Sequence, residues 1–252
     1  MPLPMMIRLS RMEKFWGLGL LLILLSACQA GLNKPTEPGA QPEASPVKAS
    51  LRLLALGDSY TAGEGVTLSE SWPQQLAALL RQNGQTVSDL TVVARSGWTS
   101  DDLLAGLQEA NPQGPYDLVV LLIGANDQFR GYSPESYRSN LSHLLSQAIH
   151  LAGGQAGQVV VLSIPDWSQA PAGALFDPRE AADDVARFNA INRSLAQAAG
   201  AGYVDLSAIW QQEAPSSDQF IADGLHPNAR QYAAWARLIL PTALQALGAV
   251  AP

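Results

Sequence analysis

The sequence is poor in several residue types that particular functions need. Its 252 residues include one cysteine, Cys28, which excludes an intrachain disulfide and a zinc site built from cysteines. Charged residues make up 15%, and the net charge is −7. This acidic balance argues against a nucleic-acid partner, which needs a basic face. Only three histidines occur, so histidine chemistry must come from His143, His150 or His226.

Several motifs of common enzyme classes are also missing. The glycine-rich stretch at residues 57–65 is not followed by Gly-Lys-Ser/Thr, so it is not a phosphate-binding P-loop. No serine lies in a Gly-x-Ser-x-Gly motif, which excludes the nucleophile elbow of α/β-hydrolases. No His-Glu-x-x-His occurs, and the three histidines are scattered along the chain. We therefore expect neither a metal nor a cofactor.

The first residues have the pattern of an export signal. Three basic residues precede an apolar run at residues 15–25: Arg8, Arg11 and Lys14. The run is too short to cross a bilayer as a stable helix but has the length of a signal-peptide core. It ends at Leu25-Ser26-Ala27-Cys28, which resembles a bacterial lipobox. This resemblance implies a lipoprotein signal peptide at residues 1–27 and lipidation of Cys28. The alternatives are an ordinary secretory peptide cut near Ala27 and a buried cysteine.

A lipidated Cys28 would anchor the protein in a membrane, because each buried methylene contributes about 0.8 kcal/mol. Gln29 follows, and similarity to Gram-negative lipoproteins implies the outer membrane where the next residue is not aspartate. The expected location is the extracytoplasmic cell envelope. Residues 28–49 contain four prolines and predict a semi-extended tether, and residues 50–252 predict one folded domain. The sequence does not determine the oligomeric state, and a monomer is compatible with it.

Beyond the tether, strand-like and helix-like segments alternate. Strands are predicted at residues 51–56, 90–94, 118–123, 159–164 and 203–206. Helices are predicted from Ser71 to about Asn83, from Thr99 or Ser100 to Leu107, from Ser133 onward, and over residues 178–199 and 229–247. This alternation predicts a flavodoxin-like α/β/α sandwich with a five-stranded parallel sheet in the order 2-1-3-4-5. Ligands bind such sheets beyond the carboxyl ends of the strands.

Polar and glycine-containing segments follow three of these strands, and another precedes the last helix. They are Gly57-Asp58-Ser59, Arg95-Ser96-Gly97-Trp98, Gly124-Ala125-Asn126-Asp127 and Asp223-Gly224-Leu225-His226. In this order, Ser59, Gly97, Asn126 and His226 are the residues that name the SGNH, or GDSL-type, serine hydrolase family. From about residue 51 to its end, the sequence resembles that family, and in particular its esterase and lysophospholipase-like members.

Three of the residues suit nucleophilic catalysis. A serine hydroxyl needs a nearby base, and histidine titrates near neutral pH. His226 is the only histidine outside the predicted helix that begins at Ser133; the other two are interpreted as surface residues. Asp223 lies three residues before His226, so a loop can bring its carboxylate to Nδ1 and leave Nε2 for Ser59. The predicted catalytic residues are Ser59, Asp223 and His226.

The resemblance assigns an oxyanion hole to the backbone N–H groups of Ser59 and Gly97 and the side-chain amide of Asn126. Glycine permits a close approach of substrate to the backbone, and asparagine offers a neutral donor that does not titrate. Asp58 is adjacent to the predicted nucleophile and is interpreted as a brace for the turn. Asp127 is likewise interpreted as structural.

The resemblance implies hydrolysis of carboxylic esters through an acyl-Ser59 intermediate. The segment from Gly124 to Asp127, with Arg130-Gly131, looks like the lysophospholipase and thioesterase branch, which implies short- to medium-chain acyl esters, lysophospholipids or thioesters as substrates. Carbohydrate O-deacetylation, which the family also performs, is an alternative. A non-catalytic lipoprotein that binds a ligand on the same fold is an alternative of another class.

Residues 164–176 follow the fourth predicted strand and carry Trp167 and Phe176. This segment is predicted to be a lid or a wall of an acyl pocket, or else a surface loop packed by its own aromatic rings. Trp98 is expected to line the same cleft.

Overall fold

The computed structural model describes residues 50–207, 209 and 216–249, so the predicted signal peptide and the whole predicted tether, including Cys28, lie outside the described residues. Within them, five parallel strands form one sheet in the order β2-β1-β3-β4-β5, which confirms the predicted topology. The strands are β1 (Leu51–Gly57), β2 (Val87–Ala94), β3 (Leu118–Leu122), β4 (Val159–Leu162) and β5 (Gly202–Val204).

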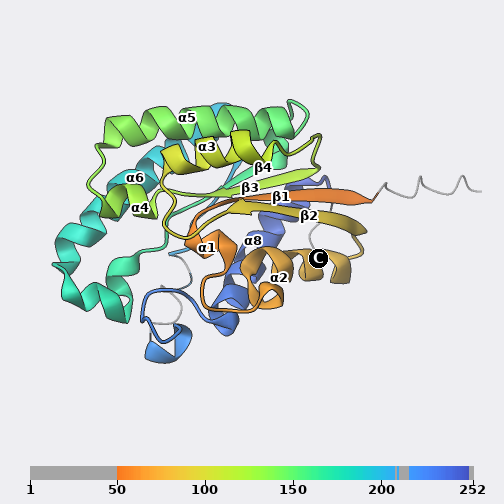
Figure 1. Ribbon diagram of the computed structural model, residues 1–252. Helices are drawn as coiled ribbons and strands as arrows, with labels where there is room; N and C mark the ends of the chain where they lie inside the picture. The colour runs from red at the N-terminus through yellow and green to blue at the C-terminus, as the bar shows by residue number, and fades with distance from the viewer. Residues whose placement is uncertain (1–49, 208, 210–215, 250–252) are drawn as a thin grey trace, which may run out of the picture. The chain divides into compact units, whose positions relative to one another are not determined.

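Helices cover both faces of this sheet (Figure 1). One layer contains α2 (Trp72–Gln82) and α8 (Ala229–Ala246), which pack against each other. The other layer contains α3 (Ser100–Ala110), α5 (Pro134–Leu151) and α6 (Pro178–Ala199), with α5 in contact with both neighbours. Two short helices begin shortly after strands: α1 (Ser59–Ala62) follows β1, and α4 (Ala125–Phe129) follows β3.

The core is formed by the central strands and the helix faces that meet them. Every residue of β3 and β4 is buried, as expected for parallel strands covered on both sides. Trp72 of α2 and Trp235 of α8, in the layer that these two helices form, are fully buried. Burial of apolar surface contributes about 25 cal/mol per Å², so this core is the main stabilising feature of the sheet on which the strand ends are carried. Among the described residues, no helix is long and apolar enough to cross a membrane.

Several predicted boundaries differ from the structure. β2 begins at Val87 rather than Leu90, because as an edge strand it is only partly buried and lacks a continuous apolar run. α3 continues to Ala110 before Asn111 ends it in a left-handed conformation. β4 and β5 end two residues earlier than predicted.

Short helical segments were not predicted at all. Besides α1 and α4, the structure contains 3₁₀ turns η1 (Leu68–Glu70), η2 (Ala156–Gln158), η3 (Trp167–Gln169), η4 (Pro171–Leu175) and η5 (Ser217–Gln219). Segments of three to five residues are too short to show helical periodicity. Two of them, η3 and η4, occupy the segment at residues 164–176.

Candidate active site

Ser59 is the first residue of α1, immediately beyond the carboxyl end of β1. The turn is fixed by Asp58, whose Oδ1 accepts a hydrogen bond from the Tyr60 N–H at 3.0 Å. Gly63 ends the helix with a φ of 80°, which a side chain would strain. Ser59 itself is only 7% exposed. The local sequence therefore holds this hydroxyl in one place rather than on a mobile loop.

His226 lies 167 residues after Ser59 in the sequence, and the fold brings the two side chains together. Its Nε2 lies 2.9 Å from Ser59 Oγ, and its Nδ1 lies 2.6 Å from Asp223 Oδ2. The other carboxylate oxygen of Asp223 accepts from the backbone N–H groups of Leu225 and His226, at 2.8 and 3.0 Å. The structure thus brings the three predicted catalytic residues into one hydrogen-bonded series. Such a series suits proton transfer from the serine hydroxyl to the imidazole.

The Asp223 carboxylate is held in its charged form. Partial burial works to raise its pKa, but hydrogen bonds from the His226 ring and from the backbone of Leu225 and His226 outweigh that effect. The pKa of Asp223 is therefore lowered from its ordinary value. A carboxylate that remains ionised can keep the proton of a neutral imidazole on Nδ1 and stabilise an imidazolium.

The predicted oxyanion donors border the same space. Gly97 lies in the turn after β2 with a φ of 80°, and Asn126 lies in α4. The Asn126 Nδ2 donates to the Trp98 carbonyl at 2.9 Å, which orients the amide and leaves its second N–H for a ligand. Ser59, Gly97, Asn126 and His226 all line one cavity of about 280 Å³.

The turn that carries Gly97 is held at three consecutive residues. Glu64 accepts a hydrogen bond from the Ser96 hydroxyl, Arg130 donates to the Gly97 carbonyl at 2.7 Å, and Asn126 holds Trp98. Neither Glu64 nor Arg130 was predicted to have this role, because each contact joins segments distant in sequence. Donors fixed before charge develops are what an oxyanion hole requires.

Asp58 and Asp127 lie near the site but do not bond to His226. Both are fully buried, and Asp127 accepts hydrogen bonds from the Ser100 backbone and hydroxyl at the start of α3. Burial raises the pKa of both carboxyls, that of Asp58 to about 7. Asp58 Oδ2 has no hydrogen-bond partner. The interpretation of both residues as braces agrees with these contacts, but the unpartnered buried oxygen was not foreseen.

Apart from Tyr60 and Ser96, the remaining walls of the cavity are apolar. They come from α4, from the segment at residues 164–176 and from the loop before His226: Ala125, Phe129, Trp167, Ala172, Leu175, Phe176 and Leu225. The expectation that residues 164–176 form a pocket wall is therefore met, and the aromatic rings also pack on one another. Trp98 does not line this cavity. Its ring lies against Gly106 of α3, in a separate surface hollow.

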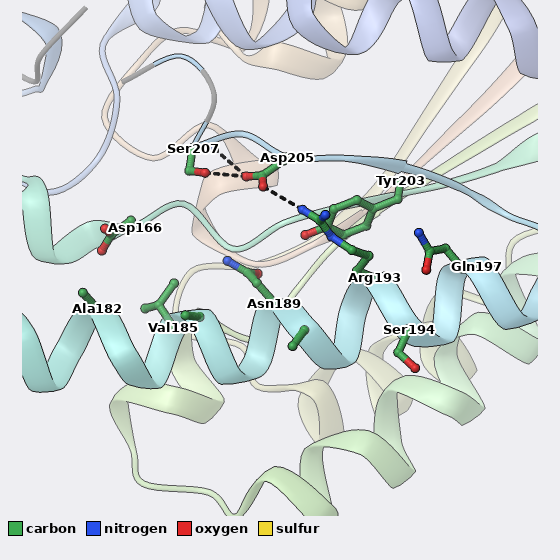
Figure 2. Close-up of a pocket in the computed structure, with 12 residues that line it drawn as sticks. Asp166, Ala182, Val185, Asn189, Arg193, Ser194, Gln197, Tyr203, Asp205 and Ser207 are labelled. Atoms are coloured by element: carbon green, nitrogen blue, oxygen red, sulfur yellow. Dashed lines mark hydrogen bonds and ion pairs between the residues drawn. The ribbon is translucent and has the colours of Figure 1, made fainter. Parts of the chain in front are cut away.

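A larger cavity of about 500 Å³ runs along α6 (Figure 2). Two of its charged groups are paired: Arg193 donates to Asp205 at 3.0 Å, and Asp205 also accepts from the hydroxyl of Ser207 at 2.5 Å. Among the described residues that line it there is no histidine beside a serine. In the described part of the chain, no cluster of three or more His, Cys, Asp or Glu side chains could hold a metal ion. The other two histidines, His143 and His150, are exposed on α5.

The fold is an α/β fold of three layers, with one parallel sheet between two layers of helices. The hydrogen bonds that join Ser59, His226 and Asp223 have the arrangement found in serine hydrolases. A family model described as "GDSL-like Lipase/Acylhydrolase family" matches residues 55–234, and the chain belongs to this family.

Curated relatives match part of the chain. An arylesterase from Vibrio mimicus is 42% identical over 101 residues, which are 39% of this chain and 49% of that protein. Thioesterase 1/protease 1/lysophospholipase L1 from Escherichia coli K12 is 34% identical over 93 residues, 37% of this chain and 43% of that protein. The chain thus matches about half the length of these relatives or less.

Solved structures share the fold over most of the chain. A crystal structure of TesA superposes with a TM-score of 0.62 at 23% identity, covering 78% of this chain and 99% of that one. An acetyl-xylooligosaccharide esterase from Geobacillus superposes with a TM-score of 0.59 at 19% identity, covering 82% and 99%.

Proposed function

We propose that the protein is a serine esterase that hydrolyses carboxylic esters through an acyl-Ser59 intermediate. The observation that supports it most is the pair of contacts from His226, 2.9 Å to Ser59 Oγ and 2.6 Å to Asp223, at the mouth of a largely apolar cavity. The arylesterase and thioesterase activities named for its relatives belong to the same type of chemistry.

In the first half of the proposed reaction, His226 Nε2 accepts the Ser59 proton while Oγ attacks the ester carbonyl carbon. The carbonyl oxygen becomes an oxyanion and accepts hydrogen bonds from the backbone N–H groups of Ser59 and Gly97 and from Asn126 Nδ2. As the tetrahedral intermediate collapses, the C–O bond to the alcohol breaks and His226 returns the proton to the departing oxygen. Asp223 stabilises the imidazolium throughout this half.

In the second half, water replaces the alcohol. His226 Nε2 takes a proton from the water, whose oxygen attacks the acyl-serine carbonyl and forms a second oxyanion in the same place. Collapse releases the carboxylic acid and returns the proton to Ser59 Oγ. No cofactor is needed, because every proton passes between Ser59, His226, alcohol and water.

The test is hydrolysis of 4-nitrophenyl esters, from acetyl to palmitoyl, by the full-length protein and its Ser59→Ala variant. We expect hydrolysis by the wild type and a loss of at least about 10⁴-fold in the variant, because the nucleophile, base and carboxylate act as a unit. Covalent labelling of Ser59 by a fluorophosphonate, located by mass spectrometry, gives an independent readout. An unchanged rate in Ser59→Ala, or no turnover of any ester, would contradict the proposal.

Carbohydrate O-deacetylation is the second candidate, and the fold shared with an acetyl-xylooligosaccharide esterase favours it. Release of acetate from acetylated xylo-oligosaccharides at a rate above that from an octanoyl ester would establish it. A protein that only binds would show affinity for an ester without turnover.

We also propose that Cys28 is lipidated and anchors the protein in the bacterial cell envelope. Support comes from Leu25-Ser26-Ala27-Cys28 after a short apolar run in the sequence alone.

A further inference from the structure

The catalytic cavity ends in a cluster of three aromatic rings. Phe129 comes from α4, Trp167 from η3, and Phe176 follows η4. Each pair of rings meets nearly edge to face, with centroids 5.3 to 5.9 Å apart. Edge-to-face pairs at this separation are favourable beyond their buried area. The three segments therefore form one wall, which we call the aromatic wall.

Exposure divides the aromatic wall into a floor and a rim. Trp167 is 7% exposed, whereas Phe129 and Phe176 are 60% and 45% exposed, and the neighbouring Leu175 is 84% exposed. Trp167 is thus the inner surface of the cavity. Large apolar side chains that remain exposed beside a catalytic pocket are surfaces that an apolar substrate group can cover.

The position of Trp167 is fixed by a hydrogen bond. Its indole Nε1–H, the only donor of the side chain, donates to Gln128 Oε1 at 2.8 Å. The same short helix, α4, therefore carries three residues of the cavity's surroundings. Asn126 is the predicted oxyanion donor, Gln128 accepts the hydrogen bond that holds Trp167, and Phe129 belongs to the exposed rim. Asn126 and Phe129 are three residues apart and lie on one side of that helix.

This placement indicates which half of an ester the aromatic wall receives. The departing alcohol oxygen must face His226 Nε2 to take its proton. The oxyanion faces Asn126, and the aromatic wall adjoins Asn126 through α4. The remaining substituent of the carbonyl carbon, the acyl chain, is therefore directed along α4 towards Trp167.

The cavity volume limits the chain. At about 280 Å³ the cavity is small beside ligand pockets of about 300–1,000 Å³, and it must also admit the ester group, so it suits a short to medium acyl chain. Resting on the proposed esterase function, we propose that the cavity is an acyl subsite for hexanoyl to octanoyl groups and that Trp167, held by Gln128, determines the maximum chain length.

The experiment measures kcat/KM of the full-length protein for 4-nitrophenyl esters from acetyl to dodecanoyl, each below its micellar concentration. In the wild type, we expect kcat/KM to rise about fourfold per methylene, equivalent to about 0.8 kcal/mol, and to stop rising at octanoyl. In Trp167→Ala the rise should continue to dodecanoyl. In Gln128→Leu, which keeps the indole but removes its acceptor, the sharp limit at octanoyl should disappear.

Each variant is read against its own rate on acetyl ester, which reports on Ser59, His226 and the oxyanion donors without filling the subsite. If Trp167→Ala fails to fold, Trp167→Phe and Gln128→Leu still test the limit. For the rim, Leu175→Ala should lower the ratio of octanoyl to acetyl turnover about threefold or more. Leu68→Ala is the matched control, because Leu68 is also an exposed leucine, at 66%, but does not line the cavity.

Two results would overturn the inference. One is acetyl hydrolysis at the normal rate with an unmoved chain-length profile in every Trp167 and Gln128 variant. The other is dependence on the length of the alcohol, in a series of alkyl acetates, without dependence on the acyl chain. Both differ from failure of the esterase proposal, in which the wild type hydrolyses no ester at all.

Discussion

Asp58 makes the stability of this domain depend on pH in an unusual direction. Its carboxyl is fully buried, accepts one hydrogen bond from the Tyr60 N–H, and has an oxygen with no partner. Burial raises its pKa from 3.8 to about 7. In the unfolded chain the group titrates near its ordinary value of about 3.9. Between these two pH values the folded protein therefore holds a proton that the unfolded chain has released.

The sign and size of the effect follow from this difference. Because the native state binds more protons than the unfolded state between about pH 4 and 7, the free energy of unfolding falls as pH rises through this window. A shift of about three pKa units at 1.36 kcal/mol each corresponds to about 4 kcal/mol in total. Roughly 3 kcal/mol of that is lost between pH 5 and pH 8.

The perturbation is Asp58→Asn, which keeps an oxygen for the Tyr60 N–H but cannot ionise. Urea unfolding of both proteins at pH 5, 6, 7 and 8 gives the free energy of unfolding at each pH. Taking the difference between the two proteins removes the contribution of groups that titrate equally in both. Relative to the wild type, Asp58→Asn should gain about 3 kcal/mol from pH 5 to pH 8, whatever its offset at pH 5.

A difference that stays constant over this range would refute the reasoning, because it would mean that Asp58 ionises in the folded protein as it does in the unfolded chain.

Three further outcomes are expected from the site and the anchor. Asp223→Asn should lower kcat about 10⁴-fold on acetyl ester while leaving the fold intact in circular dichroism, because the imidazole would lose its orienting carboxylate; a loss under tenfold would contradict the assigned role. Asn126→Ala should lower kcat about 10²- to 10³-fold with little change in KM, since its donor acts on the oxyanion; a change in KM alone would argue against it. Cys28→Ser should move the protein from the membrane pellet to the soluble fraction in cell fractionation, and retention in the pellet would show that another segment anchors it.

The fold could be predicted because its signals are local. β3 and β4 are unbroken apolar runs, and α5 begins at Ser133-Pro134, where the serine side chain caps the helix as expected. The right-handedness of the crossovers then leaves few strand orders, among which 2-1-3-4-5 is the one observed. Edge strand β2 was found only in part, because half-exposed positions such as Ser88 and Asp89 carry no apolar signal.

The residues of the candidate site could be predicted from the sequence, but the contacts that surround them could not. Ser59 and Asn126 occur in short segments at strand ends, which the topology brings together, and His226 occurs in the loop before the last helix. The contacts that set their surroundings join segments far apart in sequence, as Gln128 with Trp167 and Arg130 with Gly97 do. Neither partner of these pairs is unusual by itself, so composition and spacing could not reveal them.

Finally, the loop that carries Asp223 and His226 is closed on itself. Ile221 N–H donates to the His226 carbonyl at 2.9 Å, and an isolated antiparallel bridge joins Phe220 to Pro227. Acid and imidazole are therefore fastened to one small frame, while Ser59 belongs to another that is built on the sheet. The contact between Asp223 and His226 is local to this loop, whereas the contact between His226 and Ser59 joins segments 167 residues apart. Of the two contacts, only the second depends on how the loop packs against the segment that follows β1.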